Sequence, residues 1–202
     1  MKSNEERLQS LMDYLEQLTR INPSDIPAID LYMDQVTTFM DKNLACSRPV
    51  GEDKVLTKTM INNYAKNRLL PPPVKKRYSK NHILMLIFIY YFKNVISFHD
   101  IEQLFSPISE QHFEQGSAPE LEDLYTEIFS LEEEQRKRLK EDVMAKFEAA
   151  SNTFTDADYK DQEYLQLFSF ICELAFDVYL KKQMIELLAD QLRQENPPAK
   201  KK

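Results

Sequence analysis

Two neighbouring asparagines, Asn62 and Asn63, are the residues whose side chains are best suited to specific recognition, and they stand among basic side chains. An asparagine amide can make paired hydrogen bonds to the major-groove edge of adenine, while lysine and arginine suit the phosphates of DNA. An ordinary polar helix surface is the alternative interpretation of the two asparagines. The candidate contacts to double-stranded DNA are Lys58, Thr59, Asn62, Asn63, Lys66, Lys75, Lys76, Arg77 and Tyr78.

The charge of the chain is divided unevenly along its 202 residues. The net charge is -7, yet the stretch from Lys54 to His99 contains nine Lys or Arg residues and no Asp or Glu. The rest of the chain, with 17 basic and 33 acidic residues, therefore carries -16. Because salt confines the influence of a charge to about 8 to 10 Å, a local basic surface can attract phosphate on an acidic protein. A solvated basic face without a partner is the alternative.

Helical periodicity places five of the candidate residues on one side of a short helix. Thr57 has the side chain of an N-cap, and the prolines from Pro71 onward end the helix by about Arg68. At 100° per residue, residues 58, 59, 62, 63 and 66 fall within an arc of about 140°. The opposite, core-facing side holds Met60, Ile61, Tyr64 and Ala65. We therefore expect Tyr64 in the core, whereas Tyr78 suits either a core or a contact role.

The other elements that must position this helix are also predicted to be helical. Only two glycines occur, Gly51 and Gly116, so the chain lacks the usual glycine supply for hairpins. Apolar spacing and capping residues predict helices over 4–18, 27–44, 80–94, 98–105, 120–129, 131–150 and 156–193. The helix over 27–44 is expected to direct Ile29, Tyr32, Met33, Val36, Phe39 and Met40 inward. The helix over 80–94, apolar on nearly all sides, is expected at the centre of the core.

The predicted organisation has five parts, and at most two compact lobes. An N-terminal amphipathic helix covers 1–22, and a helix-turn-helix domain covers 23–110. A linker at 111–119 leads to a C-terminal helical region over 120–195, and a disordered basic tail covers 196–202.

Catalytic and metal-binding patterns are not found in this sequence. His82, His99 and His112 are at least 13 residues apart, without the i, i+4 pairing of a helical metal site. Cys46 and Cys172 belong to no recognisable motif, and Cys172 is expected to be a buried thiol. We therefore expect a protein that is not an enzyme and that uses no cofactor and no metal.

The apolar segments are too short for a membrane span. The longest run, Ile83 to Phe92, has ten residues, whereas a helix needs about 20 to cross a bilayer. The first residues lack the apolar core of a secretory signal. We expect a cytoplasmic protein without membrane partners, and surface association through Ile83 to Phe92 is a weaker alternative.

Three pieces of the basic region together resemble the helix-turn-helix of the mercury-resistance regulator (MerR) family. Residues 60–64 followed by 69–73 resemble a recognition helix and its exit, Tyr78-Ser79 with Ile83 resembles the start of the next helix, and residues 96–98 with Ile101 resemble the helix after it. The resemblance implies an all-α, winged helix-turn-helix fold with a short or absent wing and additional terminal helices.

The chain departs from that family at three positions and in the wing. The family usually carries Arg where Asn62 stands, an aromatic residue where Asn63 stands and Gly where Arg68 stands. Only residues 74–77 separate Pro73 from Tyr78, which predicts a truncated basic wing. The chain as a whole more closely resembles the bacterial proteins of Domain of Unknown Function 1836, a likeness that implies a family but no activity.

The pattern as a whole predicts a DNA-binding transcriptional regulator. Because one helix-turn-helix reads few base pairs, we expect a homodimer formed through the C-terminal helices. A packed bundle that completes the fold is the other interpretation of those helices. The alternative function is a protein-interaction module that keeps the helix-turn-helix scaffold without sequence-specific DNA binding.

Overall fold

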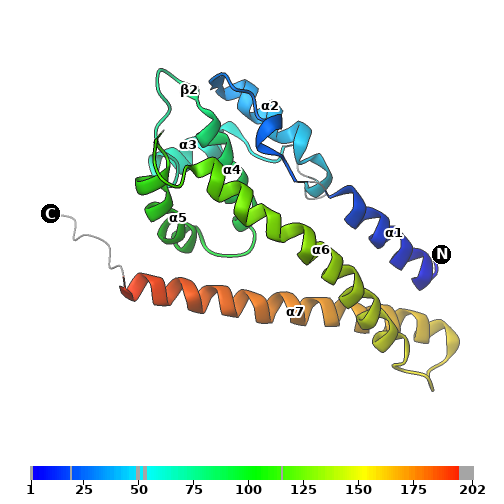
Figure 1. Cartoon of the computed structure of the whole chain (residues 1–202). Coiled ribbons are helices and arrows are strands. Elements are labelled where there is room, and N and C mark those ends of the chain that lie inside the picture. Colours follow the sequence, from blue (N-terminus) through cyan, green and yellow to red (C-terminus); the bar gives the residue numbers. More distant parts are fainter. Residues whose placement is uncertain (1, 19, 49–50, 52–53, 115, 196–202) are drawn as a thin grey trace. The chain divides into compact units, whose positions relative to one another are not determined.

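The computed structural model describes residues 2–18, 20–48, 51, 54–114 and 116–195, apart from the side chains of 159 and 160 (Figure 1). The predicted tail at 196–202 lies outside the described residues. The described chain is predominantly helical, which confirms the expected all-α class. Its elements are α1 (Asn4–Gln17), η1 (Pro23–Asp25), β1 (Leu31–Tyr32), α2 (Met33–Asn43), η2 (Ala45–Ser47), α3 (Lys58–Lys66), β2 (Arg77–Tyr78), α4 (Lys80–Phe92), α5 (Phe98–His112), α6 (Leu121–Ser151) and α7 (Tyr159–Glu195).

The chain forms two compact units, which we describe separately. The larger unit contains the described residues of 20–128 and 184–202, and the smaller unit contains those of 1–19 and 129–183. The division falls within α6 and α7 rather than in the predicted linker at 111–119.

The core of the larger unit is built around α4, which is buried continuously from His82 to Tyr90. Aromatic side chains from neighbouring helices close on it. The Phe88 ring lies 5.7 Å from the Phe105 ring of α5 and 5.5 Å from the Tyr125 ring of α6. The Tyr125 hydroxyl donates a buried hydrogen bond of 2.7 Å to the Ile21 carbonyl. The sequence prediction of a central, buried helix is thus confirmed.

A two-stranded antiparallel sheet lies beside these helices in the larger unit. Leu31 pairs with Tyr78, and Tyr32 pairs with Arg77, so β1 joins the entry of α2 to the residues directly before α4. The predicted helix start at Pro27 is therefore wrong, because residues 31 and 32 are extended to make this pairing and α2 begins only at Met33. Ile29 and Tyr32, expected to point inward, are exposed.

Two other predicted helix boundaries are wrong. The helix expected to end near Phe105 continues as α5 to His112 and includes Pro107. The proline ring of Pro107 removes one backbone hydrogen-bond donor from the helix. The end of the helix is nevertheless held by the Asn81 side chain, which donates a hydrogen bond to the Phe113 carbonyl (2.6 Å). The two helices expected at 120–129 and 131–150 are a single helix, α6.

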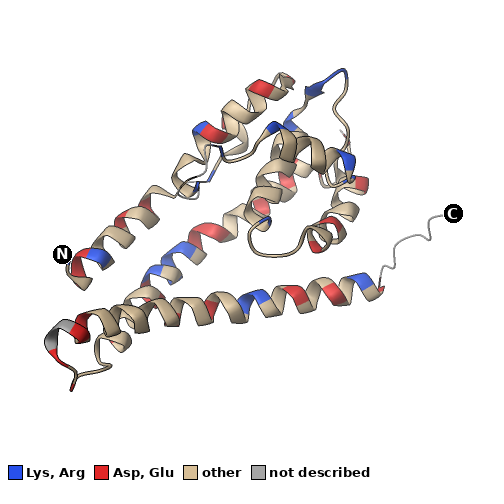
Figure 2. Cartoon of the chain, turned by 180° about the vertical axis from the view of Figure 1, so that it is seen from behind, with Lys and Arg blue, Asp and Glu red and all other residues tan. Residues whose placement is uncertain are grey.

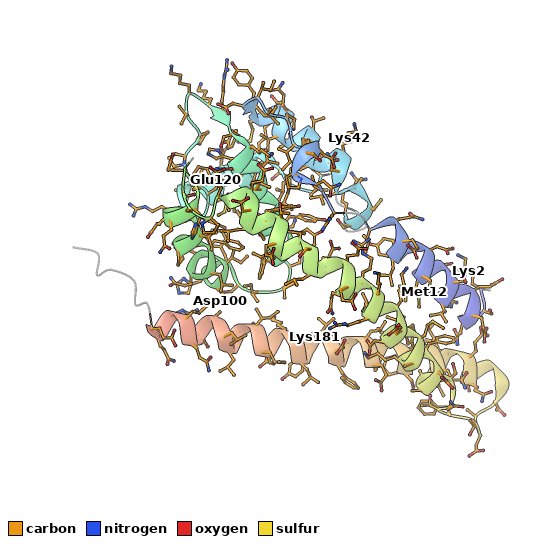
Figure 3. The ribbon with its side chains drawn as sticks, viewed as in Figure 1. Lys2, Met12, Lys42, Asp100, Glu120 and Lys181 are labelled. Carbon is orange, nitrogen blue, oxygen red and sulfur yellow. The ribbon has the colours of Figure 1, made fainter. Side chains whose placement is uncertain are left out.

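The smaller unit consists of α1 and the adjoining parts of α6 and α7. Its core is formed by Val143, Ala150 and Phe170, and side chains that include Met12 of α1 pack against them (Figure 3). The apolar stripe predicted for the first helix therefore packs on the protein itself. Cys172, expected to be buried, is only partly so. Among the described residues, no helix is long and apolar enough to span a membrane.

Candidate nucleic-acid interface

Helix α3 carries the predicted contact face, and the packing of its buried side fixes the orientation of the helix. The Thr57 hydroxyl accepts a hydrogen bond from the Met60 amide (3.2 Å), which caps the first turn as predicted. Ile61 and Tyr64 are buried, and the Tyr64 ring stacks on Phe98 with 6.1 Å between centroids. Because both inward residues are fixed, the opposite side of the helix faces solvent in one defined orientation.

The exposed side of α3 presents amides, a hydroxyl and ammonium groups. The structure places all five predicted residues of this helix on the surface: Lys58, Thr59, Asn62, Asn63 and Lys66. Among the described residues, the side-chain amides of Asn62 and Asn63 have no hydrogen-bond partner. Their donors and acceptors are therefore available to a ligand that approaches this face.

The end of α3 contains a residue in the left-handed backbone conformation. The Asn63 carbonyl accepts hydrogen bonds from the Asn67 amide (3.0 Å) and from the Asn67 side chain (2.8 Å). Arg68 follows with φ = 62°, a conformation that favours glycine and strains a residue with a Cβ. This left-handed residue ends the helix and directs the chain to the buried Leu69 and Leu70.

Residues 74–77 form a tight turn that we call the basic turn. The Arg77 amide donates to the Val74 carbonyl (2.9 Å), and the two residues form an isolated antiparallel bridge. Lys75 and Lys76 have φ values of 51° and 64°, and positive φ at both central residues is the signature of a type I′ hairpin turn. Asn-Gly is the usual occupant of such a turn, so two lysines hold this backbone with strain.

The basic turn is attached to the rest of the larger unit through Arg77. Its guanidinium donates to the Tyr32 hydroxyl (3.1 Å) and lies 5.1 Å from the centre of the Tyr32 ring. Tyr32 belongs to β1, which pairs with β2 directly after the turn. These contacts hold the lysines at the edge of the small sheet, where Figure 2 shows β2 and its turn in blue.

Not all nine basic residues of the acid-free stretch are available to a ligand. Lys58 forms an ion pair with Asp34 of α2, and Lys80 pairs with Glu122 (2.8 Å). Lys93 donates to the Val55 carbonyl (3.2 Å). Six exposed basic residues remain: Lys54, Lys66, Arg68, Lys75, Lys76 and Arg77. Among the described residues, Lys66, Lys75 and Lys76 form no ion pair.

One predicted contact residue lies in the core. Tyr78 is 3% exposed, pairs with Leu31 and meets the His82 ring edge-on at 5.4 Å. Burial raises the pKa of its phenol above the ordinary value, so the ring remains neutral. A side chain in this position cannot reach a phosphate, and we leave Tyr78 out of the proposed contact set.

Three residues extend the surface beyond the sequence prediction. Arg68 and Asn67 lie at the exposed end of α3, and Tyr32 holds Arg77. A signal for Arg68 was present in the sequence, because this arginine occupies a position where a helix terminus favours glycine. Tyr32 had no such signal, since its pairing with Arg77 joins residues 45 positions apart.

A groove with a volume of about 350 Å³ runs along the exposed end of α3. It is lined by Met60, Asn63, Tyr64, Lys66, Asn67 and Phe98. Polar amides and one ammonium group thus stand beside an apolar floor, an arrangement that suits the edge and methyl groups of a base pair or a protein side chain.

Comparison with known proteins identifies one family. The model of the family described as a domain of unknown function (DUF1836) matches residues 21–128. This range corresponds closely to the segment 20–128 of the larger unit, and it includes α3, the basic turn and Tyr32. No curated protein and no solved structure matches the chain. Because the family model covers more than half of the sequence, the chain belongs to the DUF1836 family.

Proposed function

We propose that this protein is a DNA-binding transcriptional regulator in which α3 lies in the major groove and the basic turn contacts the flanking phosphates. Asn62 and Asn63 read base edges in this proposal. Lys66, Arg68 and the basic turn neutralise phosphates. No catalytic step is involved.

The observation that carries the proposal is the presence of strained, exposed basic residues beside two side-chain amides that have no hydrogen-bond partner among the described residues. Non-glycine residues in the left-handed conformation cost of order 1 kcal/mol or more each. Arg68, Lys75 and Lys76 all adopt it, and all three are exposed and basic. Since their side chains add nothing to the core, an external anionic partner accounts for them better than folding does.

The order of the elements also supports the resemblance to the MerR family. Arg68 stands where that family carries glycine, and its φ of 62° is the conformation that explains such a glycine. Ser79 precedes α4, and Ser97 caps α5 by accepting a hydrogen bond from the Asp100 amide (3.2 Å). The basic turn is equivalent to a very short wing. In this proposal α2, which contacts α3, is the first helix of the helix-turn-helix.

The proposal is tested by measuring binding to mixed genomic DNA fragments, with fluorescence anisotropy as the readout. With four to six phosphate contacts, we expect affinity to fall about 10²- to 10³-fold between 50 and 200 mM salt. The double variant Lys66→Glu with Lys76→Glu should abolish most of the binding. Absence of a complex at low salt would refute the proposal.

The matched control is Lys137→Glu with Arg138→Glu, which changes the net charge by the same amount. Both residues are exposed on the part of α6 that belongs to the smaller unit. We expect this variant to bind DNA nearly as tightly as the wild-type chain. Equal losses in the two double variants would show that only the total charge matters.

Protein recognition is the second candidate function, and the Lys58–Asp34 ion pair favours it. The pair adds a carboxylate beside the predicted contact face, which repels phosphate. The groove at Phe98 is also large enough for an apolar side chain. Recovery of one stoichiometric protein partner that is unaffected by nuclease, together with no DNA binding, would support this function in place of the first.

A further inference from the structure

The groove beside the exposed end of α3 has both polar and apolar lining. It lies between α3 and the first turn of α5, which begins at Phe98 (Figure 1). Three of its lining residues supply amide or ammonium groups and three supply apolar or aromatic surface: Asn63, Lys66, Asn67, Met60, Tyr64 and Phe98. We call it the α3 groove. A ligand that fits it presents a polar edge next to an apolar group.

The apolar floor of the α3 groove is in position before any ligand arrives. Tyr64 is 8% exposed, and its ring stacks on Phe98 with 6.1 Å between centroids and 19° between the ring planes. Phe98 itself remains 39% exposed. It directly follows Ser97, whose hydroxyl caps α5 by accepting a hydrogen bond from the Asp100 amide (3.2 Å). Because this surface is already ordered, a ligand that covers it loses little conformational entropy in the protein.

Only one of the two amides that line the α3 groove has all of its hydrogen-bonding groups available. The Asn67 side chain donates to the Asn63 carbonyl (2.8 Å) and thereby serves the end of the helix. The side-chain amide of Asn63 has no partner among the described residues, so it offers a donor and an acceptor side by side. Adenine presents the matching pair in the major groove, N7 as acceptor and N6 as donor, whereas guanine presents two acceptors.

We propose that the α3 groove selects an A·T base pair, with Asn63 on the adenine edge and the C5 methyl group of thymine against Met60 and Phe98. The inference rests on the proposed DNA binding and names the base pair that this part of α3 recognises. Side chains three positions apart on a helix have Cβ atoms about 5 to 6 Å apart. Met60 and Asn63 have this spacing, so together they can reach two groups within the ~12 Å width of the major groove.

The apolar floor decides between A·T and G·C. Lys66 alone would favour guanine, because an ammonium group can bind N7 and O6. The cytosine of a G·C pair, however, has no C5 methyl group and presents its N4 amino group to the groove. Met60 and Phe98 offer this donor no strong acceptor, and a buried donor without a partner is unfavourable. Lys66 is exposed and forms no ion pair among the described residues, which suits a contact to phosphate.

Removal of the methyl group from the DNA tests the inference without any change in the protein. Duplexes that bind the full chain most tightly are selected from a random library, and uracil then replaces thymine at one position at a time. Uracil keeps the hydrogen-bonding groups of thymine and lacks only the C5 methyl group. We expect the selected duplexes to share an A·T pair, at which uracil lowers the affinity measured by fluorescence anisotropy about 3- to 10-fold.

Variants of the floor locate the methyl contact in the α3 groove. Phe98→Ala should bind the thymine and uracil duplexes within ~2-fold of each other while helical content by circular dichroism is unchanged. Met60→Gln, which keeps the length of the side chain, should narrow the difference in the same direction and replaces Phe98→Ala if that variant unfolds. Lys76→Ala, in the basic turn, is the matched control. It should weaken binding to both duplexes equally and keep the difference between them.

A modified adenine tests the role of the amide. 7-Deazaadenine lacks the N7 acceptor, so at the shared A·T pair it should lower the affinity of the wild-type chain about 3- to 10-fold. Asn63→Ala has already lost this contact and should bind the adenine and 7-deazaadenine duplexes within ~2-fold of each other.

The possible outcomes separate this inference from the proposed function. Salt-sensitive binding with equal affinity for the thymine and uracil duplexes would overturn A·T selection and leave DNA binding intact. A methyl effect that persists in both floor variants would overturn its assignment to the α3 groove. Absence of any complex at low salt would refute both proposals, and a protein partner lost in Phe98→Ala would then assign the groove to a protein side chain.

Discussion

The guanidinium of Arg77 is held by Tyr32, which accepts its hydrogen bond at 3.1 Å and lies beneath it with the ring centre 5.1 Å away. Tyr32 is the last residue of β1, and Arg77 is the first residue of β2. One aromatic ring therefore orders the side chain of the basic turn and connects the turn to the start of α2.

Replacement of Tyr32 by alanine tests whether this ordering serves binding. We expect Tyr32→Ala to lower DNA affinity about 3- to 10-fold, because Arg77 loses both its hydrogen bond and its cation–π contact. Tyr32→Phe keeps the ring and should have a smaller effect. The free energy of unfolding should change by less than about 1 kcal/mol because both side chains are exposed. Anisotropy and urea denaturation measure the two quantities, and an unchanged affinity in Tyr32→Ala would contradict the prediction.

Removal of backbone strain at the end of α3 should stabilise the protein and weaken its binding. We expect Arg68→Gly to raise the free energy of unfolding by about 1 kcal/mol, since glycine adopts positive φ without steric conflict. It should also reduce the salt dependence of DNA binding by one phosphate contact. Lys66→Gly, placed in the last turn of α3, is the control and should lower stability by up to about 1 kcal/mol. A lower stability of Arg68→Gly in urea denaturation would contradict this account of the strain.

The buried His82 should make stability dependent on pH. Its Nδ1 accepts a hydrogen bond from the Ser79 amide (3.0 Å), and burial lowers the pKa of its imidazole, which the carbonyls of Pro72 and Pro71 only partly oppose. Below the ordinary value near 6.5, the unfolded chain takes up a proton that the folded chain resists. The stabilisation is therefore fully present above pH 6.5 and is lost as the pH falls below it.

Urea denaturation between pH 8 and pH 5 measures this effect. His82→Gln keeps an acceptor for the Ser79 amide but cannot titrate, so the decline in stability below pH 6.5 should become shallower. His99→Gln, at an exposed histidine, controls for the loss of one imidazole. If His82→Gln left the slope unchanged, another group would be responsible for it.

The hydroxyl of Tyr125 should contribute measurably to the larger unit. Tyr125→Phe removes the donor to the Ile21 carbonyl and leaves that buried acceptor unpaired, which should lower the free energy of unfolding by about 1 to 3 kcal/mol. Helical content should remain the same. A change below about 0.5 kcal/mol would mean that water replaces the lost donor.

Local rules were sufficient to predict α3 and α4 from the sequence. Thr57 caps α3, and the apolar run from Ile83 onward gives α4 no polar side. Each of these patterns depends only on residues close together in the sequence. The exposed face of α3 followed from the same periodicity. The continuous α6 was predicted as two helices because Leu131 starts a new charged pattern, whereas Glu132 and Arg136 in fact form an i, i+4 pair (2.9 Å) within one helix.

Non-local pairing accounts for most of what the sequence did not predict. Tyr32 is extended and exposed because its partner, Arg77, lies 45 residues later. The few glycines argued against hairpins, yet Lys75 and Lys76 occupy the positive-φ positions of a hairpin turn. Tertiary contacts can hold residues in conformations that their intrinsic preferences oppose, and one sequence alone does not reveal where this happens.

The three left-handed basic residues have a consequence for laboratory evolution of this protein. Because Arg68, Lys75 and Lys76 oppose folding through their backbones, a library selected for thermal stability alone should accumulate glycine or asparagine at these positions. The same library selected for retention of the binding partner should keep the basic residues. The divergence between the two selections would map, position by position, the trade-off between robustness and recognition.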